Sequence, residues 1–208
     1  MRDKHQIIEE PCEGKLSRTV LKTNGVGDNL VEFNELCTLS TGVVFPNPKH
    51  YKTHLEKLHR LSRKFARKVK GSNNRNKAKT QLAKHHLRIA NLRKNTLHQI
   101  TTFLCKNHAK IVVEDLNVSG MLSNHKLAQV IADCGFHEFK RQLEYKAKKF
   151  GCEIIIADRW FPSSKTCSNC GHIQDMLLKE RTYNCQSCGH LMDRDLNAAI
   201  NLSRLAKA

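Results

Sequence analysis

Apolar residues recur at helical spacing in two neighbouring segments near the middle of the chain. The first segment covers about residues 51–70, the second about 82–104, and the turn-forming stretch GSNNRN (71–76) separates them. The apolar positions are Leu55, Leu58, Leu61 or Ser62, Phe65 and Val69 in the first segment, and Leu82, Ile89, Leu92, Ile100, Phe103 and Leu104 in the second. Such spacing places side chains on one face of a helix, so the pattern predicts an antiparallel helical hairpin with apolar inner faces.

A different, continuous apolar pattern marks two short stretches of the second half. AKIVVEDL (109–116) and CEIIIAD (152–158) are rich in β-branched residues, as buried strands are. Between them the spacing predicts one helix over 125–150 that ends at Gly151, and the segment from Asp193 onward predicts a last helix. Residues 1–50 offer only short β-like pieces, RTVL and LCTLSTGVV. Strands that alternate with helices indicate the α/β fold class, with a sheet buried on both faces.

Charge is concentrated on the predicted hairpin. The formal net charge is +17, and residues 51–110 carry 17 Lys or Arg against a single acid, Glu56. A solvated helical surface is one explanation, and a membrane surface is a weaker one because no Trp or Phe stripe accompanies the charge. A polyanion such as DNA or RNA is favoured, because binding phosphates to a concentrated positive field releases counterions.

Hydropathy and cysteine content indicate in which cellular compartment the chain is expected. No run of about 18 apolar residues is present, and the N-terminal stretch lacks the apolar segment of a secretory signal. We therefore expect no membrane partner and a cytoplasmic location. In that reducing environment the nine cysteines are expected to be metal ligands and free thiols before disulfides.

Four cysteines have the spacing of a zinc ribbon. Cys167, Cys170, Cys185 and Cys188 form C-x2-C, a 14-residue gap and a second C-x2-C, and each pair is followed by Gly. Four thiolates fill the tetrahedral coordination of Zn²⁺, so we predict a structural zinc and not a catalytic one; a redox pair is the alternative. His172 and His190 are expected at the surface. The scattered cysteines, Cys12, Cys37, Cys105, Cys134 and Cys152, are expected in the core.

Acidic residues end the predicted strands and begin the last helix. Glu114 lies at the carboxyl end of the first strand, where α/β sheets usually place their chemistry, but it could equally pair with a basic residue of the hairpin. Asp158 ends the second strand in the same way. Asp193 and Asp195 could each cap the last helix, so position alone does not choose among these acids.

The motifs VVEDLNVSGM, FPSSKTCSNCG, RTYNCQSCG and DRDLNAAINL, in this order, resemble the C-terminal half of the TnpB (OrfB) proteins of bacterial insertion sequences. STGVVFPNPKHY and the basic hairpin resemble the same family, from about residue 38 to the end. The resemblance implies a transposase family of RNA-guided DNA endonucleases related to type V CRISPR effectors, with DNA and a guide RNA as partners. It also implies a ribonuclease H-like (RuvC-like) core with an inserted basic hairpin and a zinc ribbon.

In that family three acids hold catalytic Mg²⁺. By motif, the second acid is Glu114 and the third is Asp195, the acid immediately before LNAA, while Asp193 is expected to be a cap. Hard oxygen ligands suit Mg²⁺ and phosphodiester hydrolysis. The first acid belongs to a strand ending in Asp-x-Gly before LSTG. Counting back without gaps reaches Leu30, and Asp28 fits only if two residues are inserted.

These motifs divide the chain into four parts. We expect a poorly matching N-terminal part (1–37), a core part (38–166) that contains the basic hairpin (about 51–110), the zinc ribbon (167–190) and the last helix of the core (191–208). Few residues precede LSTG compared with the family, which predicts a truncated member. Three functions follow: a Mg²⁺-dependent DNA nuclease, a catalytically inactive nucleic-acid-binding protein, or a remnant without function. A DNA-bound form would lie with the bacterial nucleoid.

Overall fold

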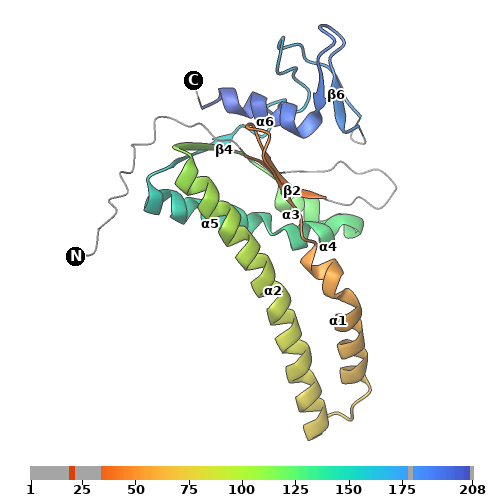
Figure 1. Cartoon of the computed structure of the whole chain (residues 1–208). Helices are drawn as coiled ribbons and strands as arrows, with labels where there is room; N and C mark the ends of the chain where they lie inside the picture. Colours follow the sequence, from red (N-terminus) through yellow and green to blue (C-terminus); the bar gives the residue numbers. More distant parts are fainter. Residues whose placement is uncertain (1–18, 22–33, 178–179, 207–208) are drawn as a thin grey trace, which may run out of the picture.

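A layer of strands lies between the C-terminal helix and the other helices in the computed structural model, which describes residues 19–21, 34–177 and 180–206 (Figure 1). The strands are β1 (Thr19–Leu21), β2 (Glu35–Leu39), β3 (Val44–Pro46), β4 (Lys110–Glu114), β5 (Glu153–Ala157), β6 (Thr182–Asn184) and β7 (Leu191–Asp193). The helices are α1 (His50–Ala66), α2 (Asn73–Asn107), α3 (Val118–Leu122), α4 (His125–Cys134), α5 (Phe136–Phe150) and α6 (Arg194–Arg204). The predicted mixture of helices and strands is therefore confirmed.

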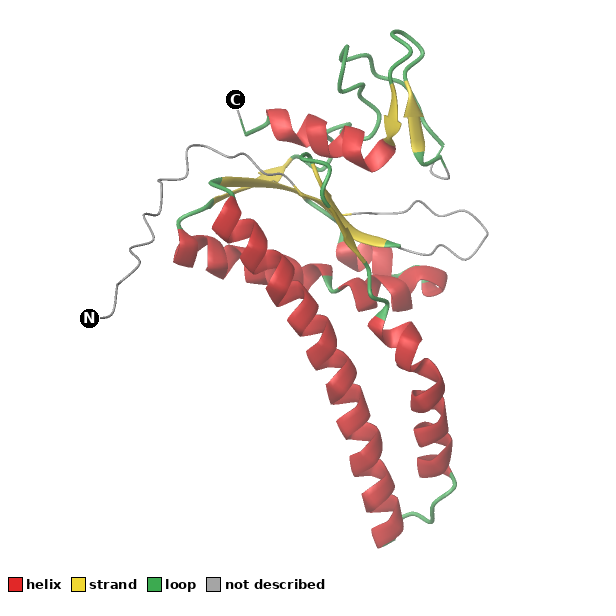
Figure 2. Ribbon diagram, viewed as in Figure 1, coloured by secondary structure: helices red, strands yellow, loops and turns green. Residues whose placement is uncertain are grey.

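The strand layer combines parallel and antiparallel pairing. β4 and β5 pair in parallel, from Lys110 opposite Glu153 to Glu114 opposite Ala157. β1, β2 and β3 form an antiparallel sheet, in which β2 pairs with both neighbours, and β1 lies beside β4. Figure 2 shows α6 on one side of this layer and α2 and α5 on the other. The parallel pair therefore brings the carboxyl ends of two strands to the same edge.

Strand β4 is buried on both faces, as its continuous apolar sequence predicts. Ile111 and Val113 belong to the larger core cluster, formed with residues of β2, α2, α4 and α5. Val112, which points the opposite way because side chains alternate along a strand, packs with α6 residues such as Ala199 and Leu202. Helices on both sides therefore fix the strand that ends at Glu114.

The basic hairpin forms, with different ends from those expected. α1 ends at Ala66, so Val69 lies beyond it and is 77% exposed. α2 begins at Asn73, within the predicted break, because the Ser72 hydroxyl accepts a hydrogen bond from the Arg75 N–H and caps the helix. Phe103, expected on the inner face, is 42% exposed and packs edge-on against Phe45 at 5.6 Å between ring centroids.

The single helix expected over 125–150 was wrong, because Gly135 divides it into α4 and α5. Gly135 has a φ of 68°, in the left-handed region that glycine adopts without strain. A Cβ at this position would meet the Leu97 side chain at 3.1 Å, so α2 also packs closely against the break. The end of the segment was predicted correctly: Gly151 terminates α5, and its N–H donates to the Ala147 carbonyl.

The cysteines outside the ribbon pack in the interior, as predicted for those that the structure describes. Cys37, Cys105 and Cys134 are buried and Cys152 is partly buried, while Cys12 lies outside the described residues. Burial raises the pKa of Cys105 and of Cys134 to about 12, which keeps both thiols protonated and unreactive. Within the described part of the chain, no helix is long and apolar enough to cross a membrane.

Candidate metal sites and nucleic-acid surface

The predicted zinc ribbon consists of two matching turns. In the first, the Cys167 N–H donates to the His172 carbonyl and the Gly171 N–H donates to the Cys167 carbonyl. The second repeats this arrangement with Cys185, His190 and Gly189. Gly171 and Gly189 have φ values of 78° and 67°, which explains why a glycine follows each cysteine pair. Each turn therefore presents two sulfur atoms to the other.

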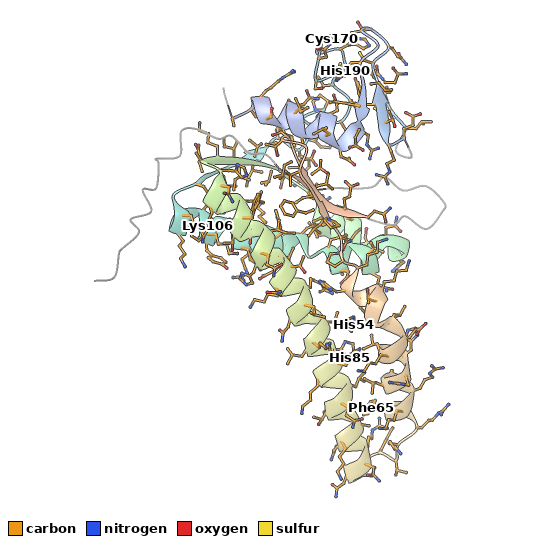
Figure 3. All side chains as sticks on the ribbon, viewed as in Figure 1. His54, Phe65, His85, Lys106, Cys170 and His190 are labelled. Atoms are coloured by element: carbon orange, nitrogen blue, oxygen red, sulfur yellow. The ribbon has the colours of Figure 1, made fainter. Side chains whose placement is uncertain are left out.

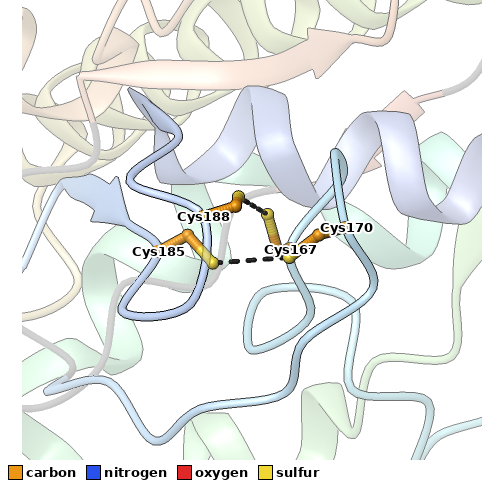
Figure 4. Close-up of side chains that lie close together, drawn as sticks. All are labelled: Cys167, Cys170, Cys185 and Cys188. Carbon is orange, nitrogen blue, oxygen red and sulfur yellow. Dashed lines mark hydrogen bonds between the residues drawn. The ribbon is translucent and has the colours of Figure 1, made fainter.

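The four cysteine sulfurs are close enough to share one metal ion (Figure 4). All four Sγ atoms lie within 4.8 Å of one another; Cys167 and Cys188 are 3.8 Å apart, and Cys170 and Cys185 are 3.6 Å apart. A tetrahedral ion with Zn–S bonds of about 2.3 Å places its sulfurs roughly 3.8 Å apart, so the site fits Zn²⁺. Within the described residues, no other group of three or more His, Cys, Asp or Glu side chains meets in this way. The exposed His172 lies outside the group, as expected.

The surroundings of Cys188 favour its thiolate, whereas burial and the hydrogen bonds with the other cysteines raise the pKa of Cys170 to about 11. The backbone hydrogen bond from His190, with contacts from neighbouring side chains, lowers the pKa of Cys188 to about 6. The Asn169 N–H also points at the Cys167 sulfur, at 3.4 Å. Tyr183 is fully buried beneath the site and donates its hydroxyl to the Lys165 carbonyl at 3.1 Å. Burial and then the nearby cysteines raise the pKa of Tyr183 to about 12, so it remains a neutral donor.

Two buried asparagines attach the ribbon to α6, and the sequence analysis did not identify them. The Asn197 side chain accepts the Ser168 N–H at 2.8 Å and donates to the Thr166 carbonyl at 2.7 Å. One helical turn later, Asn201 donates to the carbonyls of Thr166 at 2.6 Å and Ser163 at 2.9 Å. We call Asn197 and Asn201 the amide pair. Their four-residue spacing within the apolar NAAIN segment was the available signal, since it places two amides on one buried helix face.

Glu114 lies at the carboxyl end of β4, where its carboxylate accepts the Ser163 hydroxyl at 2.8 Å. Burial, and then the negative charge of nearby Asp195, raise the pKa of Glu114, whereas the Ser163 hydrogen bond and the charge of Arg194 oppose that shift. Asp195 is buried in the first turn of α6, and the Arg194 guanidinium lies 3.7 Å from its carboxylate. The structure thus brings together Glu114 and Asp195, which are 81 residues apart in the sequence.

The other acids have different positions. Asp193 is the N-cap of α6, as predicted, because its carboxylate accepts the N–H groups of Asp195 and Leu196. Asp158 accepts the Trp160 N–H and so belongs to the turn after β5. Asp28 lies outside the described residues, so its proposed role as first acid stays a prediction.

A cavity of about 490 Å³ opens beside Glu114, between β4, α3 and α5. Its floor is apolar and includes Val113, Phe136 and Phe139, while Lys140 and Arg159 add positive charge to its lining. A cavity of this size can hold a ligand as large as a nucleotide. Glu114, which with Asp195 we call the acidic pair, therefore adjoins a space with an apolar floor whose charged lining combines Lys140 and Arg159 with Asp115.

The hairpin that carries the basic side chains extends away from the strand layer (Figure 3). A shallow groove on α1 and just beyond its end is lined by Arg60, Arg63, Lys64, Arg67 and Lys68. Arg75 of α2 stacks over the Phe65 ring, 4.3 Å from its centroid, and donates to the Lys68 carbonyl, so the tip of the hairpin is ordered by its own contacts. Between the helices, His85 is buried with its ring 5.5 Å from that of His54, and burial lowers the pKa of His85. The positive charge of the hairpin therefore lies on its outer surface, whereas the buried His85 between the two helices favours its neutral form.

The fold and these sites define a class: a mixed α/β protein with a four-cysteine ribbon, an acidic pair at a strand end and a basic helical hairpin. Comparison with known proteins supplies the family. A family model described as "Probable transposase", for OrfB proteins, matches residues 31–125, and one described as "Cas12f1-like, TNB domain" matches residues 136–202. The chain belongs to the TnpB/OrfB family, which confirms the resemblance inferred from its motifs.

The relatives are longer than this chain. A protein of Streptomyces pristinaespiralis named "Putative RNA-guided DNA endonuclease" is 41% identical over 192 residues, which are 92% of this chain and 47% of the relative. InsQ of Escherichia coli K12, which bears the same description, is 36% identical over 184 residues, covering 81% of this chain and 46% of the relative. The chain thus spans about half the length of these relatives.

Solved structures support the fold. A Cas12f1–sgRNA–target DNA complex contains a chain that matches with a TM-score of 0.59 at 17% identity, covering 90% of this chain and 49% of that one. A CRISPR-Cas12f ternary complex gives a TM-score of 0.58 at 18% identity, with 96% and 40% coverage. At these identities the likeness concerns the fold alone.

Proposed function

We propose that this chain is the DNA-cleaving part of an RNA-guided endonuclease of the TnpB type. In this proposal its strands and α6 form a RuvC-like, ribonuclease H-like core, and the hairpin and the ribbon are insertions in that core. The proposed parts are an N-terminal part (1–37), a core part at 38–166 with the hairpin at about 51–110, the ribbon at 167–190 and the last helix at 191–208. DNA and a guide RNA are the proposed partners.

The single observation that carries the proposal is the meeting of Glu114 and Asp195. Burial and then the negative charge of Asp195 raise the pKa of Glu114, so keeping both carboxylates ionised in this site is costly. A divalent cation would relieve that repulsion, and carboxylate oxygens are the ligands that Mg²⁺ prefers. Glu114 and Asp195 would hold Mg²⁺, with Asp28 proposed as the third acid. When bound, Mg²⁺ stabilises the charge that develops on phosphate oxygens.

Other residues would support that site. Ser163 fixes one Glu114 oxygen by its hydroxyl, which orients the carboxylate. The N-terminal end of α6 favours the negative charge of Asp195. The ribbon, held by structural Zn²⁺ at its four cysteines, would fix the loop that carries Ser163 through the amide pair. The hairpin would bind phosphates by its positive charge.

Cleavage of plasmid and single-stranded DNA in the presence of Mg²⁺ tests the proposal. We expect Glu114→Gln and Asp195→Asn each to abolish cleavage, because each removes one negative oxygen ligand. The matched control is Glu153→Gln, which changes an exposed carboxylate at the opposite end of β5. Cleavage that survives Glu114→Gln would refute the assignment of the site.

A second candidate function is nucleic-acid binding without cleavage. The observation that favours it is the buried guanidinium of Arg194, which lies 3.7 Å from the Asp195 carboxylate and whose charge lowers the pKa of Glu114. A positively charged side chain therefore already lies beside the two acids. Calorimetry with Mg²⁺ distinguishes the two functions. Tight DNA binding with neither Mg²⁺ binding nor cleavage would support this second candidate.

A further inference from the structure

The loop after β5 presents a tryptophan to solvent. Trp160 is 85% exposed, the most exposed of the large hydrophobic side chains in the described part of the chain. An indole normally buries a large apolar area, so its exposure forgoes a substantial stabilisation. A tryptophan that faces solvent is therefore a candidate ligand-binding residue.

The loop is fixed on both sides of Trp160. The Asp158 carboxylate accepts the Trp160 N–H at 2.7 Å, and the Asp158 carbonyl accepts the Phe161 N–H at 3.1 Å. Phe161 packs against the apolar side of α6. On the other side, the Arg159 guanidinium donates to the Asp115 carboxylate at 2.6 Å. These contacts therefore fix the backbone on both sides of Trp160, and the indole takes part in none of them.

These anchors also place Trp160 near the acidic pair. Arg159 contacts Asp115 and Ser163 contacts Glu114, so the loop touches two successive residues at the end of β4, one on each side of Trp160. Arg159 also lines the cavity of about 490 Å³ beside Glu114. A group that stacks on Trp160 would therefore lie beside the loop that contacts Glu114 and borders the cavity.

We propose that Trp160 is a stacking platform for one base of a single-stranded nucleic acid at the acidic pair. The choice of ligand rests on the proposed function and on the charge of +17, which suits a polyanion. The hairpin binds phosphates and Trp160 binds a base face, the two elements that proteins combine to bind single strands. Stacking would hold the strand with one phosphate near Glu114.

Intrinsic fluorescence tests this directly, because Trp160 is the chain's sole tryptophan. A mixed-sequence single-stranded DNA is titrated in buffer without Mg²⁺, so that the strand stays intact. We expect the DNA to quench Trp160 emission and to protect it from iodide. An oligonucleotide of equal length whose central nucleotides are abasic should bind with little quenching, because it keeps the phosphates and lacks base faces.

Affinity measured by anisotropy of a labelled strand provides the second readout. Stacking contributes about 1–3 kcal/mol per base, so Trp160→Ala should weaken binding by between about 5-fold and 150-fold, and Trp160→Phe should retain most of the affinity. Phe150→Ala is the matched control, since this partly exposed aromatic precedes the opposite end of β5. It should leave affinity unchanged.

Three results would overturn the inference. The first is DNA binding that leaves Trp160 emission unchanged, and the second is equal quenching by the abasic strand. The third is an emission change that depends on protein concentration without DNA, which would assign the indole to a protein contact. The fluorescence titration contains no Mg²⁺ and does not depend on cleavage. A protein that fails to cleave DNA in the separate assay with Mg²⁺ would refute the proposed endonuclease, and the fluorescence result would still test the role of Trp160.

Discussion

Replacing Asn197 by alanine tests whether α6 holds the zinc ribbon in place. Asn197 is fully buried and makes two hydrogen bonds to the segment that begins the ribbon, one from the Ser168 N–H and one to the Thr166 carbonyl. Alanine removes both bonds. The Thr166 carbonyl keeps its bond from Asn201, whereas the buried Ser168 N–H loses its acceptor. The damage is therefore concentrated on one backbone donor.

The expected loss follows from these contacts. A buried donor without its partner costs about 1–3 kcal/mol, and the second hydrogen bond contributes about 1 kcal/mol. The better helix propensity of alanine offsets roughly 0.5 kcal/mol. The free energy of unfolding should therefore fall by roughly 1.5–3.5 kcal/mol, which for a chain of this length lowers Tm by roughly 3–14 °C.

Thermal unfolding followed by circular dichroism, together with zinc release to a colorimetric chelator, measures this effect. Asn91→Ala is the matched control: it makes the same change on the exposed face of α2 and should shift Tm by less than about 2 °C. Zinc should leave the Asn197→Ala protein at a lower temperature than the parent. A shift in Tm equal to that of the control would refute the role of Asn197 in holding the ribbon.

Three more predictions concern the other sites. Cys188→Ser should reduce the zinc content, measured by atomic emission, to well below about one ion per chain, because one of four thiolate ligands is lost. Since the pKa of Glu114 is raised in the fold, its ionisation destabilises the protein as pH rises above the ordinary glutamate value of 4.5. Glu114→Gln should therefore raise Tm at pH 7 and have little effect below pH 4, and a lower Tm at pH 7 would contradict this. Lys64→Glu should weaken DNA binding and flatten its salt dependence, whereas Lys148→Glu on α5 should do neither; equal effects would remove the hairpin from the interface.

Features set by local sequence could be predicted. The four cysteines meet because C-x2-C fixes each pair within one turn, and Asp193 caps α6 because its carboxylate reaches backbone N–H groups only two and three residues away. The two helix boundaries at the hairpin turn were misplaced, since the Ser72 cap begins α2 inside a stretch that favours turns. The break at Gly135 was missed because a single glycine inside a helical pattern does not reveal that its φ is positive.

Contacts between distant parts of the chain could not be predicted from spacing. Ser163 and Glu114 are 49 residues apart, and nothing in FPSSK indicates which serine turns toward a carboxylate. The amide pair likewise bonds to carbonyls more than 30 residues away. Such contacts depend on how β4, the loop after β5 and α6 pack, so they emerge only with the fold.

The position of the ribbon next to the acids has a physical reason in α6. The first turn of this helix carries Asp195, and the face that follows carries Asn197 and Asn201. Asn201 bonds to the Ser163 carbonyl, and the Ser163 hydroxyl bonds to Glu114, so one helix holds one acid directly and orients the other through a serine. Both amides bond to Thr166, and Asn197 also bonds to Ser168, so they hold the two residues that flank Cys167. A ribbon folded around zinc would therefore limit the motion of the loop that fixes Glu114, so a structural metal would influence the geometry of the acidic pair through these hydrogen bonds.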